Sequence, residues 1–416
     1  MFITRRSMLK SVFAGTGLVA YGLDAPGFLS RTLAATPRLD EKGGKETILV
    51  VVQLTGGNDG LNTVIPFSDP LYASSRPTLK QKPADMKKLT KEIALHPAMG
   101  GMAELWQDQA LSIVQGVGYP NPSQSHFTSM DIWHSAQLKS PYSDGWLGRS
   151  LGLMNRGAGS GYHLANKGEA SPLALSGPVK CPSITSLTDL ELHTIGQNGS
   201  DRRKQRESIE QNSVSGNAGN NSALLDFVQR TATGTFATVN RLREIAKQYQ
   251  PKVPYPENGL AERLKLAAQL IDAEIGSRVY YVEQDGYDTH ADQAASHSRL
   301  LGELSSSLTA FYKDLKARGQ EKRVLILTFS EFGRRVKENG SQGTDHGAAA
   351  PVFLIGGKVQ PGLIGDHPRL DRLDDGNLKH HTDFRSIYAT ALDQWLGVKS
   401  LEVLKEQFKP VKLIKA

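Results

Sequence analysis

Residues 46–60 read ETILVVVQLTGGNDG, an apolar run of strand length that ends abruptly in glycines and small polar residues. Residues 48–52 show no alternation of apolar and polar positions, so both faces of the strand are expected to be buried, as in a parallel sheet covered by helices. The turn that follows places Asn58 and Asp59 at the carboxyl end of the strand. Open parallel sheets bind ligands beyond the carboxyl ends of their strands. We therefore expect an α/β fold with polar groups at that edge.

Apolar runs separated by amphipathic segments continue along the chain. Further strands are predicted at residues 110–117, 277–284, 323–329 and 351–355, and helices near residues 97–109, 128–138, 224–248, 260–274, 292–316 and 383–396. Strands that alternate with helices predict a mostly parallel sheet with helices on both faces. Residues 150–222 are rich in Gly, Ser, Asn and Pro, and we expect them to form an irregular insertion or a lid.

The composition of the 416 residues is typical of a globular protein, with 39% hydrophobic and 22% charged residues. The single cysteine, Cys181, excludes an intrachain disulfide and a zinc site built from clustered cysteines. No apolar run in the body of the chain reaches the ~20 residues that a membrane-spanning helix needs. The formal charge of +7 suggests nucleic acid, but no basic stripe is interleaved with aromatic residues. We expect no nucleic-acid partner.

The N-terminal segment, residues 1–35, carries part of the positive charge, with four basic residues against one acidic residue. It begins with the paired Arg5 and Arg6, continues with an apolar stretch at residues 11–23, and ends in small residues at 33–36. This order is typical of a bacterial export signal, and the paired arginines resemble the twin-arginine type. We therefore expect an exported protein, periplasmic or extracellular, that meets the twin-arginine export machinery and keeps no stable membrane span after processing.

Polar side chains collect at the predicted strand ends and in one loop that precedes a strand. They are Asn58 and Asp59 after the first strand, Ser123, Ser125 and His126 after the second, Asp288 and His290 after the strand at 277–284, Glu331 after the strand at 323–329, and Asp345 and His346 before the strand at 351–355. Carboxylates, imidazoles and hydroxyls together suit a hard or borderline divalent metal and a hydroxyl nucleophile. The metal prediction rests on this joint placement.

Each residue taken alone also has a structural explanation. Asp59 suits a turn, because Asn and Asp tolerate turn conformations. Ser125 and Thr128 both suit the N-cap of the following helix, so the nucleophile is open among Ser123, Ser125 and Thr128. The Asp-x-His of residues 288–290 is too short to establish a metal site alone.

Five phrases and the N-terminal signal together resemble a known family. The phrases are QLTGGNDGLNTVIP at 53–66, SHF at 125–127, GYDTH at 286–290, SEFGR at 330–334 and TDHG at 344–347. They resemble a functionally uncharacterised group of twin-arginine-exported bacterial proteins within the alkaline phosphatase/sulfatase-like superfamily. The resemblance implies one domain over residues 45–416, folded as a three-layer α/β/α sandwich with a mostly parallel central sheet.

The resemblance also implies roles for the residues at the strand ends. The superfamily's typical site holds two divalent metals and a serine, threonine or modified-cysteine nucleophile. Ser125 or Ser123 resembles the nucleophile. Asp288, His290 and His346 resemble the ligands of one metal, although the superfamily's enzymes usually space the first two more widely.

The ligands of the second metal depart from the superfamily pattern. Asp59 resembles the aspartate that binds this metal, and Glu331 stands where the enzymes carry the first residue of an Asp-His pair. The next position is Phe332, and a phenyl ring cannot bind a divalent ion. Asn58 or His126 remains as a further donor to this metal. The sequence is therefore compatible with either one or two bound divalent ions, and Zn, Mn, Mg and Ca are the candidates.

The function expected from these observations is hydrolysis of phosphate or sulfate esters in a small molecule or a polymer. Ser125 would attack the ester while Arg334 or Arg335 holds its oxygens in a bidentate clamp. The alternative is a non-catalytic protein with the same fold that serves binding or assembly in the cell envelope. A lost metal ligand is typical of a protein that has lost its enzymatic activity.

Overall fold

The computed structural model describes residues 46–154, 160–166, 169–179, 181–186, 244 and 247–415. The expected export signal at 1–35 and most of the helix expected at 224–248 lie outside the described residues. The described residues of Leu39–Ile184, Pro251–Ala268 and Ser277–Ala416 form one compact unit, which contains the sheet and every predicted site residue. Of the second unit the structure describes few residues, among them Gln269–Gly276.

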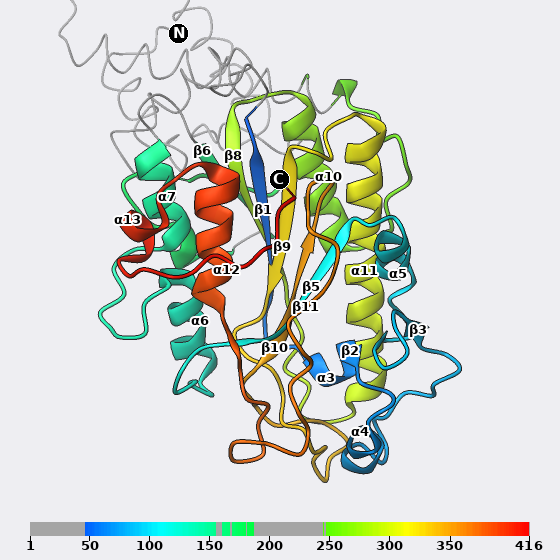
Figure 1. The fold of residues 1–416 in the computed structure, drawn as a ribbon. Coiled ribbons are helices and arrows are strands. Elements are labelled where there is room, and N and C mark those ends of the chain that lie inside the picture. The colour runs from blue at the N-terminus through cyan, green and yellow to red at the C-terminus, as the bar shows by residue number, and fades with distance from the viewer. Residues whose placement is uncertain are drawn as a thin grey trace, which may run out of the picture. The chain divides into compact units, whose positions relative to one another are not determined.

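A nine-stranded sheet forms the centre of the first unit (Figure 1). Strand β1 (Ile48–Leu54) pairs in parallel with β8 (Ser277–Gln284) on one side and β9 (Val324–Phe329) on the other. Beyond β8 lie β6 (Ser160–Leu164) and β7 (Ser183–Ile184), and beyond β9 lie β10 (Ala350–Ile355), β5 (Leu111–Gly118) and β11 (Gly362–Ile364), with β12 (Thr382–Asp383) also paired to β5. All seven residues of β1 are buried, which explains its unbroken apolar run.

Strand β10 is the exception to the parallel arrangement, because it pairs antiparallel with both β9 and β5. Its first residue therefore lies at the sheet edge where β1, β5, β8 and β9 end. This reversal brings the loop that precedes β10, including His346, to the same edge as the loops that follow the parallel strands. An isolated bridge between Arg334 and His346 joins the β9 and β10 loops there.

Helices cover both faces of the sheet (Figure 1). One face carries α5 (Gly100–Gln107), α11 (Gln293–Ala317) and the part of α10 (Gly259–Asp272) that belongs to this unit, up to Ala268. The other face carries α6 (His126–Ser135), α7 (Trp146–Met154), α12 (Phe384–Thr390) with the π-helical turn η2 (Ala391–Leu396), and α13 (Ser400–Leu404). On the second face aromatic rings fill the core: Trp146 stacks on Tyr388 at 4.0 Å and Trp133 on Phe384 at 4.3 Å. The predicted three-layer α/β/α sandwich is confirmed.

Smaller elements complete the first unit. They are α3 (Gly60–Thr63), α4 (Pro70–Ser75), the 3-10 helix η1 (Leu173–Leu175), and a three-stranded sheet of β2 (Val64–Ile65), β3 (Lys87–Lys88) and β4 (Ala94–Leu95). In the part of the chain that the structure describes, no helix combines the length and the apolar character needed to cross a bilayer.

The predicted strands are confirmed, and the differences lie in short elements. Strand β6 falls inside residues 150–222, so part of the segment expected to be irregular belongs to the central sheet. This strand reads SGYHL and has no apolar run. A Cβ on its Gly161 would lie 2.7 Å from a methyl group of Leu151, so a larger residue at this position would displace the Leu151 side chain of α7.

Candidate metal centre

Three side chains from different loops meet at the carboxyl edge of the sheet. His126 is the first residue of α6 and follows β5, Asp288 follows β8, and His346 precedes β10. The Nε2 atoms of His126 and His346 lie 3.4 and 3.2 Å from Asp288 Oδ1, and one ligand atom from each residue lies within 4.8 Å of the other two. We call these three residues the metal group. Two imidazoles and a carboxylate are common ligands of a divalent transition metal.

His290 lies beside the metal group and adds a fourth donor. Its Nε2 is 2.9 Å from His346 Nε2 and 3.1 Å from Asp288 Oδ1. Its Nδ1 faces Asp345 Oδ1 at 3.4 Å, and that carboxylate also accepts a hydrogen bond from Asn339 Nδ2 at 3.1 Å. Asp345, a predicted metal residue, therefore lies behind His290. The structure thus brings together four of the predicted residues, His126, Asp288, His290 and His346.

The far nitrogens of the two histidines in the metal group are fixed by oxygen atoms. His126 Nδ1 lies 2.8 Å from Glu331 Oε1, and His346 Nδ1 lies 2.8 Å from the carbonyl oxygen of Gln124. An Nδ1–H that donates to oxygen leaves the Nε2 lone pair free for a metal, which is the usual arrangement of metal-binding histidines. The hydrogen bond to Glu331 also raises the pKa of His126.

His126 Nε2 is buried and makes no hydrogen bond to any described residue. A buried polar atom without a partner costs free energy, and native structures contain few of them. This atom faces Asp288 Oδ1 at a distance too long for good geometry. A cation among the metal group would satisfy it, so the residues present fit a divalent metal.

Glu331 supports the metal group from behind. Its side chain is fully buried and accepts hydrogen bonds from the backbone N–H of Gly56 at 2.9 Å and the hydroxyl of Ser330 at 3.1 Å, in addition to its contact with His126. The sequence interpretation made Glu331 a metal ligand. The structure instead directs its carboxylate to the far side of a ligand imidazole.

Arg334 is buried and donates to five oxygen atoms of the protein. Four are the carbonyl oxygens of Gly56, Gly57, Tyr287 and Thr344, and the fifth is Asp288 Oδ1 at 2.7 Å. Partial burial raises the pKa of Asp288, but the hydrogen bond and the charge of Arg334 outweigh it and lower that pKa to about 2. Arg334 was expected to clamp the oxygens of a substrate. Because its donors serve the loops around the site, it holds Asp288 in place and ionised instead.

Asp59 and Asn58 do not join the metal group. Both Asp59 oxygens accept hydrogen bonds from Arg76, a residue whose sequence context carries no functional signal. The Asn58 side-chain oxygen accepts from His297 Nε2 at 3.0 Å and from the Thr63 hydroxyl at 3.1 Å. The structure therefore separates these two predicted metal residues from the other predicted ligands.

Phe332 forms an apolar wall against the metal group. Its ring centroid lies 4.9 Å from that of His126 and 4.7 Å from that of His346. Phe332 thus packs directly on two imidazoles of the metal group. It shields them on one side, while the side chains of Asp288 and His290 remain 49% and 44% exposed.

The predicted hydroxyls lie at the start of α6. Ser125 is the exposed N-cap residue, immediately before His126, and its hydroxyl makes no capping hydrogen bond. Ser123 is half-buried, and its hydroxyl accepts from the Ser125 backbone N–H at 3.2 Å. Thr128 is exposed in the first turn of the same helix. Of the three hydroxyls, that of Ser125 is adjacent in sequence to a residue of the metal group.

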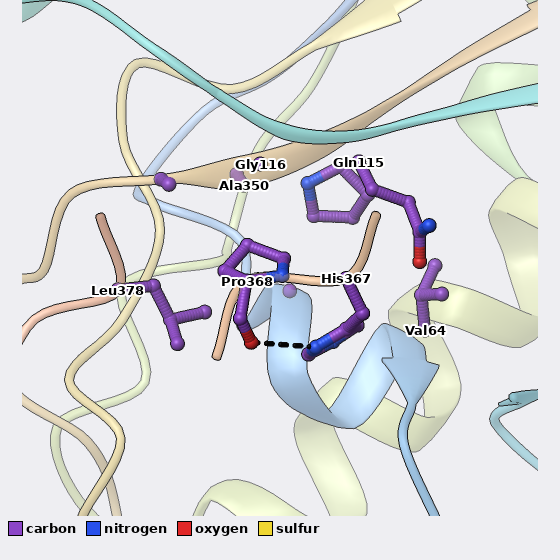
Figure 2. Close-up of a pocket in the computed structure, with 10 residues that line it drawn as sticks. Val64, Gln115, Gly116, Ala350, His367, Pro368 and Leu378 are labelled. Carbon is purple, nitrogen blue, oxygen red and sulfur yellow. Dashed lines mark hydrogen bonds between the residues drawn. The ribbon is translucent and has the colours of Figure 1, made fainter. Parts of the chain in front are cut away.

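A separate hollow lies between β5, β10 and the loop at 365–368. Figure 2 shows His367 and Pro368 on its wall, where His367 Nδ1–H donates to the Pro368 carbonyl at 2.9 Å, together with the side chains of Val64 and Gln115. Its volume of about 20 Å³ leaves room for about one water molecule. None of its lining residues belongs to the metal group.

The chain belongs to the family of proteins of unknown function DUF1501, whose match covers residues 31–406. Among curated proteins, none matches this sequence.

Solved structures with a similar fold include members of the alkaline phosphatase and sulfatase group. PsFucS1 sulfatase from Pseudoalteromonas sp. is 12% identical over 94% of this chain and 74% of that chain, with a TM-score of 0.37. A protein in the alkaline phosphatase superfamily from Vibrio parahaemolyticus is 9% identical over 88% and 72%, with a TM-score of 0.32. The C-terminal periplasmic domain of EcEptC from Escherichia coli, in complex with Zn, is 9% identical over 75% and 73%, with a TM-score of 0.36. At these values the similarity extends no further than the general fold.

Proposed function

We propose that this protein is an exported hydrolase of phosphate or sulfate esters that depends on a divalent metal bound by His126, Asp288 and His346, with His290 as a fourth donor. The observation that carries the proposal is the unpartnered, buried Nε2 of His126, which faces the other two donors of the metal group. Three nitrogens and one carboxylate oxygen suit Zn²⁺ or Mn²⁺ better than Mg²⁺ or Ca²⁺, which prefer oxygen ligands.

The residues around the site prepare it for ester hydrolysis. A divalent cation in this position supplies Lewis-acid polarisation of an ester oxygen. Glu331 and the Gln124 carbonyl hold the protons of His126 and His346 on Nδ1, which keeps both Nε2 lone pairs directed at the same point. Arg334 holds Asp288 in place and lowers the pKa of its carboxyl.

Ser125 is the proposed nucleophile because it is exposed, uncapped and adjacent to His126. Its Oγ forms a bond to phosphorus or sulfur while the bond to the ester oxygen breaks, and the hydroxyl proton leaves with the alcohol. Water then hydrolyses the seryl ester and regenerates the hydroxyl. Small-molecule and polymer esters both fit this chemistry, because the exposed edge of the site is open to solvent.

Residues 1–35 are proposed to direct export through the twin-arginine machinery to the periplasm or beyond. The paired Arg5 and Arg6 before an apolar segment support this proposal. Changing both arginines to lysine should abolish export of the full chain, measured by cell fractionation. Undiminished export of the Arg5→Lys/Arg6→Lys protein would contradict it.

The hydrolase proposal is tested by metal analysis and ester assays on one set of purified proteins. The wild type should retain Zn²⁺ or Mn²⁺ and hydrolyse aryl phosphates or aryl sulfates. Asp288→Asn should lose both properties, and Ser125→Ala should lose activity but keep the metal. Asp285→Asn is the matched control, since Asp285 is an exposed carboxylate in the same loop and outside the metal group.

One observation favours the alternative of a non-catalytic envelope protein. Phe332 occupies a position where the related enzymes carry a metal ligand, and its ring packs on the metal group. Under this alternative the wild type binds metal through the same residues but hydrolyses neither class of ester. Metal binding without turnover on phosphate and sulfate esters would therefore favour the alternative over the hydrolase.

A further inference from the structure

A second group of side chains of the types that bind metals lies in the protein interior, separate from the metal group. It comprises Asp59 and Asn58 after β1, His297 on α11, and His96 and Arg76 from the segment between β1 and β5, and we call it the Asp59 cluster. All five residues are buried, with at most 3% of each exposed. A carboxylate, an amide and two imidazoles would suit a second divalent ion if their donor atoms were free.

The carboxylate of this cluster is already occupied. Asp59 Oδ2 accepts from Arg76 Nη1 at 2.6 Å and from Gln293 Nε2 at 2.5 Å, and Oδ1 accepts from Arg76 Nη2 at 3.0 Å. Burial raises the pKa of Asp59, but the charge and hydrogen bonds of Arg76 outweigh it and lower that pKa to about 2. Asp59 is therefore an anion whose charge is matched by a fixed guanidinium.

Arg76 is held as firmly as its partner. Beyond the paired contacts with Asp59, it donates from Nε to the Val336 carbonyl at 2.6 Å and from Nη2 to the Arg335 carbonyl at 2.9 Å. Its side chain is 0% exposed. A guanidinium bound in this bidentate way cannot leave without abandoning a buried carboxylate.

The two imidazoles of the cluster are also satisfied and neutral. His297 Nε2 donates to the Asn58 side-chain oxygen at 3.0 Å, and His96 Nδ1 accepts from the Ala98 backbone N–H at 3.2 Å. Burial lowers the pKa of both histidines to about 4. In contrast to His126, no polar atom of this cluster is among the unpartnered buried atoms of the described residues. The cluster does not fit a second divalent ion.

We propose that Arg76 takes the place of a second metal ion, so that each chain binds one divalent cation. Within the described residues its ligands come from the metal group and His290, and this inference rests on the proposed function for that site. The ion pair remains connected to the site through Gln293, whose Oε1 accepts from the hydroxyls of Thr289 at 3.0 Å and Thr344 at 2.6 Å. These threonines adjoin Asp288, His290 and Asp345, so Arg76 is a positioning residue for the loops that carry the metal group.

The stoichiometry of metal binding tests this inference directly. Metal-free wild type is titrated with Mn²⁺ and with Zn²⁺, and we expect one equivalent per chain. Asp59→Asn should retain that equivalent, and Asp288→Asn should lose it. Two equivalents in the wild type, with one lost in Asp59→Asn, would overturn the role of Arg76 and leave the hydrolase proposal standing. No bound equivalent would overturn the proposed function, and this inference with it.

A gain of metal response in an arginine variant provides the second measurement. Arg76→Ala leaves Asp59 buried without its cation, so millimolar Mn²⁺ should raise the melting temperature of this variant more than that of the wild type. Arg385→Ala is the matched control, because Arg385 is a buried arginine paired with Asp383 at 2.7 Å outside both clusters. A folded Arg76→Ala protein that responds no more than this control would overturn the inference. If Arg76→Ala does not fold, the titration of the wild type and Asp59→Asn decides it.

Discussion

At the scale of single residues, the metal group depends on the atoms behind its ligands. Glu331 contacts His126 Nδ1 and is itself held by a backbone N–H and a hydroxyl. Removing a partner of this kind typically weakens metal affinity ~10–100-fold. Under the proposed function the carboxylate would act on the metal through the imidazole that it orients.

Glu331→Gln should lower metal affinity by about one to two orders of magnitude, because the neutral amide is a weaker acceptor and no longer fixes the His126 tautomer. The titration that measures stoichiometry also measures this affinity, with Asp285→Asn as the control that should bind as tightly as the wild type. Equal affinity in Glu331→Gln and Asp285→Asn would show that Glu331 does not direct His126 toward a metal.

The sequence predicted the proximity of three residues in loops at the sheet edge. Asp288, His290 and His346 were expected together from GYDTH and TDHG, and their side chains meet. The positions of Glu331 and Asp59 were expected, but their partners were not. A carboxylate near a metal either binds it, supports a ligand or pairs with an arginine, and the choice depends on residues such as Arg76 that carry no sequence signal.

At the scale of elements, the turn after β1 packs closely against the Phe332 ring, which borders the metal group. Gly57 has φ +77°, and a Cβ at this position would lie 2.4 Å from the Phe332 ring. Gly319, at the end of α11, has a similar φ of +67° with nothing within 4 Å of the corresponding position. The two glycines share a left-handed backbone and differ in their surroundings.

Gly57→Ala and Gly319→Ala therefore form a matched pair. Both should lose about 1 kcal/mol for the left-handed backbone, and Gly57→Ala should lose a further ~1–3 kcal/mol because its methyl group meets the Phe332 ring. Displacement of this ring from His126 and His346 should also weaken metal binding in Gly57→Ala alone. Thermal unfolding and metal titration measure the two effects. Equal melting temperatures for the two variants would contradict the close packing described.

The elements that the sequence predicted are those with strong local patterns. β1 and β9 are long apolar runs, β8 has an apolar centre at residues 279–282, and the helix at 293–317 has a clear amphipathic repeat. Two features had no local signal. β6 is short and mixed, and its place beside β8 depends on pairing across more than 100 residues. The direction of β10 also depends on its neighbours, although it decides where His346 lies.

At the scale of the whole molecule, several histidines are enclosed in the protein interior. Burial lowers the pKa of His134 to about 3 and those of His96 and His297 to about 4. In the unfolded chain each titrates near its ordinary value of about 6.5. The folded state therefore binds fewer protons than the unfolded state over the intervening pH range.

This difference fixes the sign of the pH dependence. The stability contributed by the neutral histidines is complete above pH ~6.5 and is lost as the pH falls toward 4, at up to ~1.4 kcal/mol per pH unit for each histidine. The three histidines together should therefore make the stability fall by up to roughly 4 kcal/mol per pH unit, before most carboxylates titrate.

Urea unfolding midpoints of the wild type, measured at pH 7.5, 6.5, 5.5 and 4.5, should fall steeply below pH 6.5. The measurements are made with a chelator present, so that loss of a bound metal at low pH does not add to the change in stability. His134→Gln removes one titrating group while keeping a side chain that can face Gln53, its partner at 2.7 Å. The variant should be less stable at pH 7.5, because the contact is altered, yet lose less stability between pH 6.5 and 4.5. The slope of the unfolding midpoint against pH is the informative quantity, because a purely structural role for His134 would shift the midpoints equally at every pH. Parallel curves for wild type and variant would show that its burial does not couple folding to pH.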